Sequence, residues 1–137
     1  MSQPVEKAHV VCRGRKFVVE FAVLDDRSMP AKTYMDSLDP SDRVNLVAYM
    51  KHLADNGIIH NQPKKFKLER FPFWSFKRKG KGRRKIRIPC YQQDLRWILT
   101  HGFDKPARSE WDEQEFTTAT AIRNEQLTRE RKQQKKD

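Results

Sequence analysis

Three strand-like segments joined by short connections constrain the fold more than any other feature of the sequence. Residues 70–77, 85–91 and 95–103 are rich in the aromatic and branched side chains that favour strands. The connections between them are residues 78–84 and residues 92–94. Connections this short cannot form the crossover that parallel neighbours require. The sequence therefore predicts three consecutive antiparallel strands.

The part of the chain before these strands predicts one more strand and two helices. Residues 17–24 show the alternation of a strand. A short helix is expected near residues 28–38, and a longer one between Asp39 as N-cap and Gly57 as its end. The stripe of the longer helix expected to pack on the sheet consists of Val44, Val47, Met50, Leu53 and Ala54.

The expected fold class is α+β: a single domain with the order β–α–α–β–β–β–α, a twisted antiparallel sheet and a helical hairpin packed on one face. A last helix, small or mobile, is expected after residue 109, and the domain is expected to span residues 1–128. Residues 129–137 have no apolar content and are expected to fray. Pro89 cannot donate a hydrogen bond within a sheet, so it predicts a bulge or a gap in the pairing.

Positive charge is concentrated in one segment of the chain. The 137 residues include 29 Lys and Arg and 18 Asp and Glu, a formal charge of +11. The segment from Lys64 to Arg87 contains twelve basic residues and a single acidic one, Glu69, so the formal charge of the rest of the chain is zero. A neutral scaffold with one basic band indicates a polyanion-binding protein. A solvated charged loop is the alternative interpretation.

Several other kinds of site are not expected. Cys12 and Cys90 are the only cysteines and form no CxxC motif, which argues against a disulfide framework or a zinc site. The carboxylates lie at turns and helix starts rather than in the cluster that a two-metal nuclease needs, so neither a metal nor another cofactor is predicted. No stretch is long and apolar enough to span a membrane, and a cytoplasmic protein is expected.

The strand at residues 85–91 places Arg87 and Tyr91 on the face opposite its isoleucines. If helices cover the isoleucine face, these two side chains lie beside the basic run and offer single-stranded RNA both a cation and a ring. His101 ends the last strand near Lys105 and Arg108, where an imidazole could act in general acid–base catalysis. A histidine that only bonds backbone groups is an equally valid interpretation.

Residues 15–128 resemble HigB-type toxins of the RelE superfamily, in the branch related to phage proteins. The resemblance is carried by four pieces in order: the strand and two helices of residues 18–57, then "FPFWSFK", "RKIRIPCY" and "WILTHGFDKP". It implies a RelE-like fold and a ribosome-dependent endoribonuclease that cuts mRNA in the A site without a metal. In such enzymes the 2′-hydroxyl of the substrate attacks the adjacent phosphate, which leaves a 2′,3′-cyclic phosphate and a 5′-hydroxyl.

Carried over to this sequence, the resemblance implies that Arg87 and Lys105 stabilise the phosphate and that His101 transfers a proton. The residues expected to bind RNA are Lys77, Arg78, Lys79, Lys81, Arg83, Arg84, Lys85, Tyr91 and Arg108. The implied partners are the ribosome, mRNA and a cognate HigA-like helix-turn-helix antitoxin, which would itself bind operator DNA. Ser75 and Pro106 depart from the family pattern, where Glu and Lys are usual. A non-catalytic RNA- or DNA-binding module on the same scaffold is therefore the alternative.

Overall fold

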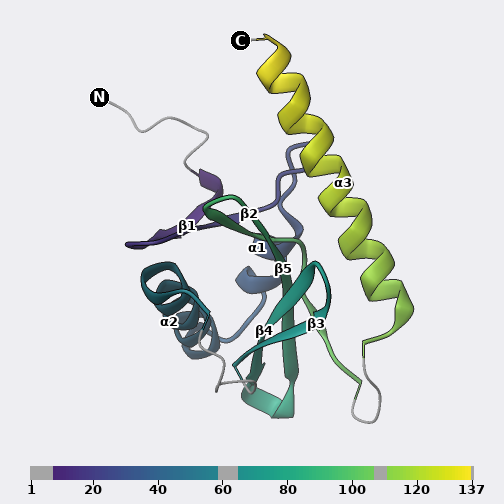
Figure 1. The fold of residues 1–137 in the computed structure, drawn as a ribbon. Coiled ribbons are helices and arrows are strands. Elements are labelled where there is room, and N and C mark those ends of the chain that lie inside the picture. Colours follow the sequence, from purple (N-terminus) through teal and green to yellow (C-terminus); the bar gives the residue numbers. More distant parts are fainter. Residues whose placement is uncertain (1–7, 59–64, 107–110, 137) are drawn as a thin grey trace.

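The computed structural model describes residues 8–58, 65–106 and 111–136, which form an α+β fold around a mostly antiparallel sheet of seven strands (Figure 1). The strands are β1 (Val10–Arg13), β2 (Val18–Phe21), β3 (Phe66–Arg70), β4 (Phe73–Lys79), β5 (Lys85–Gln93), β6 (Arg96–Leu99) and β7 (Phe103–Asp104). The helices are α1 (Pro30–Asp36), α2 (Pro40–Asn56) and α3 (Glu113–Lys136), and the 3-10 turn η2 (Lys81–Arg83) lies between β4 and β5. The α+β class predicted from the sequence is confirmed.

The sheet has the order β1–β2–β6–β5–β4–β3, and β7 also pairs with β5. The predicted antiparallel run is confirmed in β4, β5 and β6. The prediction of a wholly antiparallel sheet is wrong, because β2 runs parallel to β6, from Val18 opposite Arg96 to Phe21 opposite Leu99. Two helices and three strands separate β2 from β6 in the chain, and a connection of that length permits a parallel pair.

The segment predicted as one strand at residues 70–77 belongs to two. β3 ends at Arg70, the chain turns at Phe71 and Pro72, and β4 returns antiparallel to β3. At the other end of the sheet, β1 also precedes the strand predicted at residues 17–24. Both additional strands lie at the edges of the sheet, which runs from β1 to β3.

Pro89 lies at a gap in the pairing of β5, as its missing N–H predicts. On one side β5 is paired without interruption to β4, with Pro89 opposite Ser75. On the other side, β6 pairs with β5 only from Cys90 onward and β7 only at Ile86 and Arg87. The amide of Thr100 donates to the Pro89 carbonyl across this gap at 2.9 Å. The chain therefore accommodates a proline in a central strand without a break in the β4–β5 register.

Helix α2 has the predicted ends but a different buried face. The Asp39 side chain accepts a hydrogen bond from the Ser41 amide at 3.1 Å, and Gly57 ends the helix with φ of +79°. Val44, predicted to pack on the sheet, is 68% exposed and Val47 is half-buried, whereas Met50, Leu53 and Ala54 are buried as predicted. Asp42 and Leu46 are buried instead, and Asp42 accepts hydrogen bonds from the Arg78 guanidinium of β4 and from the Lys81 amide.

Helices cover both faces of the sheet. The predicted helical pair, α1 and α2, packs on the face that carries Phe76, Ile86 and Ile88. On the other face, α3 packs through Ala119 and Ile122 against a second apolar cluster. Figure 1 shows α3 as a long helix that continues beyond the sheet, rather than a small element, and it includes most of the tail expected to fray. Within the described residues, no helix has the length and apolarity needed to cross a membrane.

Candidate nucleic-acid interface

Two pairs of cations lie opposite each other on the α3 side of the β4–β5 hairpin. Lys77 is in register with Arg87, and Lys79 is in register with Lys85. Like charges directly opposite on antiparallel strands lower stability. This arrangement therefore does not help the fold, and it favours a role in binding an anion.

Four cationic side chains from separate segments line one small cavity of about 90 Å³, which we call the cationic pocket. Its lining residues are Lys67 of β3, Lys77 of β4, Arg87 of β5, Lys105 after β7, Glu69 of β3 and Trp111 before α3. Drug-sized ligands occupy cavities of roughly 300–1,000 Å³. The cationic pocket is much smaller, and its described lining has one carboxylate for four cations, so a single phosphate group fits both its size and its charge.

Backbone hydrogen bonds fix two of the pocket lysines relative to Arg87. β7 pairs with β5 so that Phe103 lies opposite Arg87, and the Lys105 amide then donates to the Lys85 carbonyl at 2.8 Å. Lys77 is fixed by the β4–β5 register on one side and by a hydrogen bond from its amide to the Lys65 carbonyl, at 2.9 Å, on the other. The pocket is therefore built on paired strands rather than on a loop.

The environment of the pocket changes the acidity of Lys77. Burial lowers the pKa of the Lys77 ammonium, and the nearby charge of Arg87 lowers it further, while Glu69 acts in the opposite direction. Burial also lowers the pKa of Arg87, but a guanidinium stays charged under any physiological condition. One Arg87 Nη donates to the Ile86 carbonyl at 2.8 Å, which holds the planar group in place. The pocket thus combines a fixed cation with a lysine that gives up its proton more readily than usual.

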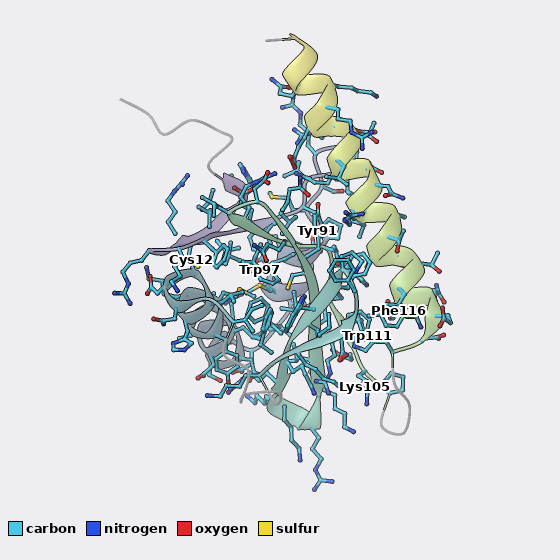
Figure 2. The ribbon with its side chains drawn as sticks, viewed as in Figure 1. Cys12, Tyr91, Trp97, Lys105, Trp111 and Phe116 are labelled. Atoms are coloured by element: carbon cyan, nitrogen blue, oxygen red, sulfur yellow. The ribbon has the colours of Figure 1, made fainter. Side chains whose placement is uncertain are left out.

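Trp111 closes the cationic pocket on the side of α3. The side chain is 8% exposed, and its indole N–H has no partner among the described residues. Its ring contacts Phe103 edge-on, with centroids 5.2 Å apart, and lies 4.7 Å from the ring of Phe116. Figure 2 shows Trp111 and Phe116 near the start of α3, with Lys105 close by. A buried donor without a partner at the edge of a cationic cavity suits an acceptor such as a phosphate oxygen.

Three cations of the basic run are occupied by carboxylates of the protein itself. Arg78 lies on the α2 face, where its Nε is 2.7 Å from Asp42 and an Nη donates to the Tyr49 hydroxyl at 3.1 Å. The Lys81 amide donates to the same buried Asp42 carboxylate at 2.9 Å, and the Lys81 ammonium lies 3.4 Å from Asp39. Arg84 donates twice to Asp104, at 2.9 and 3.0 Å. These predicted RNA-binding side chains hold the connection between β4 and β5 in place.

The connection between β4 and β5 is a tight, hydrogen-bonded turn. It contains the turn η2 and is closed by a hydrogen bond from the Gly80 amide to the Arg84 carbonyl at 2.8 Å. Lys79 and Arg83 are exposed on it and remain available to a polyanion. Lys85 is half-buried beside the pocket, and Arg108 lies outside the described residues.

Tyr91 and His101 do not lie where the sequence predicts. Tyr91 is on the same face as Arg87, but α3 covers that end of the face and leaves the ring fully buried. It therefore offers no surface on which a base could stack. His101 is 7% exposed and does not line the cationic pocket.

The contacts of His101 are internal to the fold. One ring nitrogen lies 2.9 Å from the Thr100 hydroxyl and the other 3.2 Å from Glu115 of α3. Burial lowers the pKa of His101, although the hydrogen bond to Glu115 opposes the shift. The geometry assigns this histidine to the attachment of α3 rather than to the pocket.

Sequence reasoning missed Lys67, Glu69 and Trp111. A signal for the first two was present, because Phe66 and Leu68 alternate with Lys67 and Glu69 in the way a strand requires. That alternation places the two charged residues on one face. Trp111 carried no comparable signal, since its place depends on where α3 begins.

Comparison with known proteins adds no relative: no protein-family model matches the chain, and no curated protein matches it in sequence. Within the described residues, no group of three or more His, Cys, Asp or Glu side chains is placed to hold a metal ion.

Proposed function

We propose that this protein is a metal-independent endoribonuclease whose active site is the cationic pocket. By its resemblance to HigB-type toxins, we propose further that it is a ribosome-dependent mRNA interferase of a type II toxin–antitoxin system. The observation that carries the proposal is the convergence of Lys67, Lys77, Arg87 and Lys105 on one cavity that also holds a carboxylate.

The pocket contains the groups that RNA cleavage by the 2′-hydroxyl needs. The Glu69 carboxylate takes the proton from the 2′-hydroxyl, whose oxygen forms a bond to the adjacent phosphorus. The bond from phosphorus to the 5′-oxygen breaks, and the Lys77 ammonium gives its proton to that oxygen. The products are a 2′,3′-cyclic phosphate and a 5′-hydroxyl, and water returns the two groups to their starting protonation states.

Each pocket residue has a role that follows from its environment. The lowered pKa of Lys77 makes its ammonium a better proton donor to the leaving oxygen. The held guanidinium of Arg87, with Lys105, stabilises the charge that develops on the phosphorane oxygens. Glu69, half-buried with an oxygen 3.8 Å from the Lys67 ammonium, takes the proton-transfer role that the sequence suggested for His101.

Cleavage of the proposed substrate also requires the ribosome. A single pocket contacts a short stretch of RNA, and the resemblance implies that the ribosome holds the mRNA in position for attack. A cognate HigA-like antitoxin that covers the pocket would block access to the ribosome. Expression of the protein alone should then stop growth, and co-expression with the antitoxin should restore it.

The test is translation of a defined mRNA in a purified system, with the new RNA ends mapped by primer extension. We expect cuts in the codon at the A site, with a 2′,3′-cyclic phosphate on the upstream fragment. An mRNA with one 2′-deoxynucleotide at the cut position should stay intact. Glu69→Gln and Lys77→Met should each lower single-turnover cleavage by roughly 10²- to 10⁴-fold, the usual contribution of a general acid or base.

Binding to ribosomes or RNA without new RNA ends would contradict the endoribonuclease and support the alternative, a non-catalytic binding module. Fragments that carry a 5′-phosphate would contradict attack by the 2′-hydroxyl. Full activity of both variants would remove Glu69 and Lys77 from the chemistry.

A further inference from the structure

A second groove lies next to the cationic pocket, between the β3–β4 turn and α3. Its volume is about 470 Å³, within the range of small-ligand sites. The turn contributes Arg70, Phe71 and Pro72 to its lining, and α3 contributes Phe116, Thr120 and Asn124.

The most unusual residue of this groove is Phe71. Its side chain is 84% exposed, the largest exposed fraction among the large apolar residues described. An aromatic ring left in water gains from a flat apolar partner, because stacking removes both surfaces from solvent.

The groove and the cationic pocket share a wall. Glu69 lines the pocket, and the next residue, Arg70, lines the groove. The ring of Trp111 in the pocket lies 4.7 Å from the ring of Phe116 in the groove. Two residues of extended chain span at most about 7 Å, so Phe71 lies within reach of a nucleotide that neighbours the pocket.

The charges of the groove differ from those of the pocket. Arg70 is paired with Glu113, with a nitrogen and an oxygen 2.6 Å apart, and its guanidinium lies 3.9 Å from the centre of the Phe116 ring. The one cation among the described lining residues is therefore neutralised, and the rest of that lining is mostly aromatic, methyl, hydroxyl or amide. Such a surface suits a nucleobase, whereas the pocket beside it suits a phosphate.

We propose that the groove binds a base of the RNA strand whose phosphate occupies the cationic pocket, with the base stacked on Phe71. The amide of Asn124 and the hydroxyl of Thr120 offer donors and acceptors to the edge of that base. This subsite rests on the proposed function, because it requires single-stranded RNA in the pocket. It would give the enzyme a preference for the base next to the cut.

The test measures binding of a short, single-stranded 2′-O-methyl RNA, which cannot be cleaved, by fluorescence anisotropy at low salt. Phe71→Ala should weaken binding by about 5- to 150-fold, the range that corresponds to 1–3 kcal/mol for one stacked base. Phe71→Trp should restore it. Val44→Ala is the matched control, because Val44 is also exposed, at 68%, but lies on α2, which packs on the opposite face of the sheet.

A series of RNAs with a single abasic site identifies the stacked position. The effect of Phe71→Ala should disappear for one abasic position and persist for the others. Equal binding by Phe71→Ala and Val44→Ala would overturn the proposal, as would an effect of Phe71→Ala that no abasic site removes. A variant that loses only antitoxin binding would assign the groove to a protein instead. Because this RNA cannot be cleaved, the binding results do not depend on catalysis. Failure of the base site would leave cleavage in the translation assay intact, whereas failure of the proposed function would show as absent cleavage in that separate assay.

Discussion

The basic run at residues 78–84 and the cationic pocket differ in what surrounds their charges. In the basic run, Arg78 and Arg84 are paired with Asp42 and Asp104, and the Lys81 ammonium lies 3.4 Å from Asp39. In the pocket, four cations share Glu69. The run is the densest positive segment of the sequence, yet most of its charge stabilises a turn. The density of charge along a sequence therefore does not identify the site, and the local balance of cations and carboxylates does.

The largest difference between the two regions should appear in catalysis. Arg87→Ala should lower single-turnover cleavage by about a hundredfold or more, because a preorganised donor to the phosphorane is lost. Arg83→Ala, in the exposed turn, should change the rate by less than about threefold, since one exposed phosphate contact contributes little. Cleavage is measured beside ribosome binding, which Arg87→Ala should leave nearly intact. Proportional losses of binding and cleavage in both variants would mean that the pocket only grips RNA.

Stability should change in opposite directions in the two regions. Asp42→Asn removes the buried carboxylate that Arg78 and the Lys81 amide share, and we expect a loss of about 2–3 kcal/mol in the free energy of unfolding. Lys77→Met in the pocket removes a cation opposite Arg87 and should leave stability unchanged or slightly higher. Urea unfolding at pH 7 compares the two. A strong loss of stability in Lys77→Met would show that the pocket charges are structural as well.

The Asp42 contribution should also depend on pH. Hydrogen bonds from the Lys81 amide and the Arg78 guanidinium lower the pKa of Asp42 below its ordinary 3.8. Its stabilising effect is thus complete above about pH 4 and is lost as the pH falls through the lowered value. The difference in unfolding free energy between the protein and Asp42→Asn should shrink over that range.

The smallest effect concerns His101, which lies outside both regions. Because burial lowers its pKa below 6.5, the unfolded chain binds this proton more readily, and stability should fall as the pH drops below about 6.5. His101→Gln should remove that decline between neutral and mildly acidic pH. The cleavage rate of His101→Gln should keep the pH profile of the unmodified protein, which would show that His101 takes no part in proton transfer. A shifted profile would return His101 to the chemistry.

The sequence correctly predicted the elements that depend on interactions between residues close together in the chain. Capping by Asp39 and the end at Gly57 defined α2, and the short connections defined the β4–β5–β6 run. The position of Arg87 on the face opposite the isoleucines was also correct.

The errors came from contacts between distant segments. Tyr91 was predicted to be exposed because nothing in the sequence shows that α3 covers one end of its face. Val44 was predicted to be buried because nothing in the sequence shows that Asp42 is buried in a pair with Arg78, a residue far away in the chain. The alternation around Arg78 did contain a usable signal, since it places that cation on the helix-covered face with Phe76.

The parallel pairing of β2 with β6 sets the order in which the chain can fold during synthesis. The partner of β2, β6, is synthesised only after more than half of the chain. Forming this contact requires closure of a long loop, which is slow. Until then β2 and β5 each present an open edge, which can pair with other nascent chains. Lys105 and Trp111 follow β6, so the cationic pocket is completed later still. A chain released early would therefore tend to aggregate and would lack its complete phosphate site.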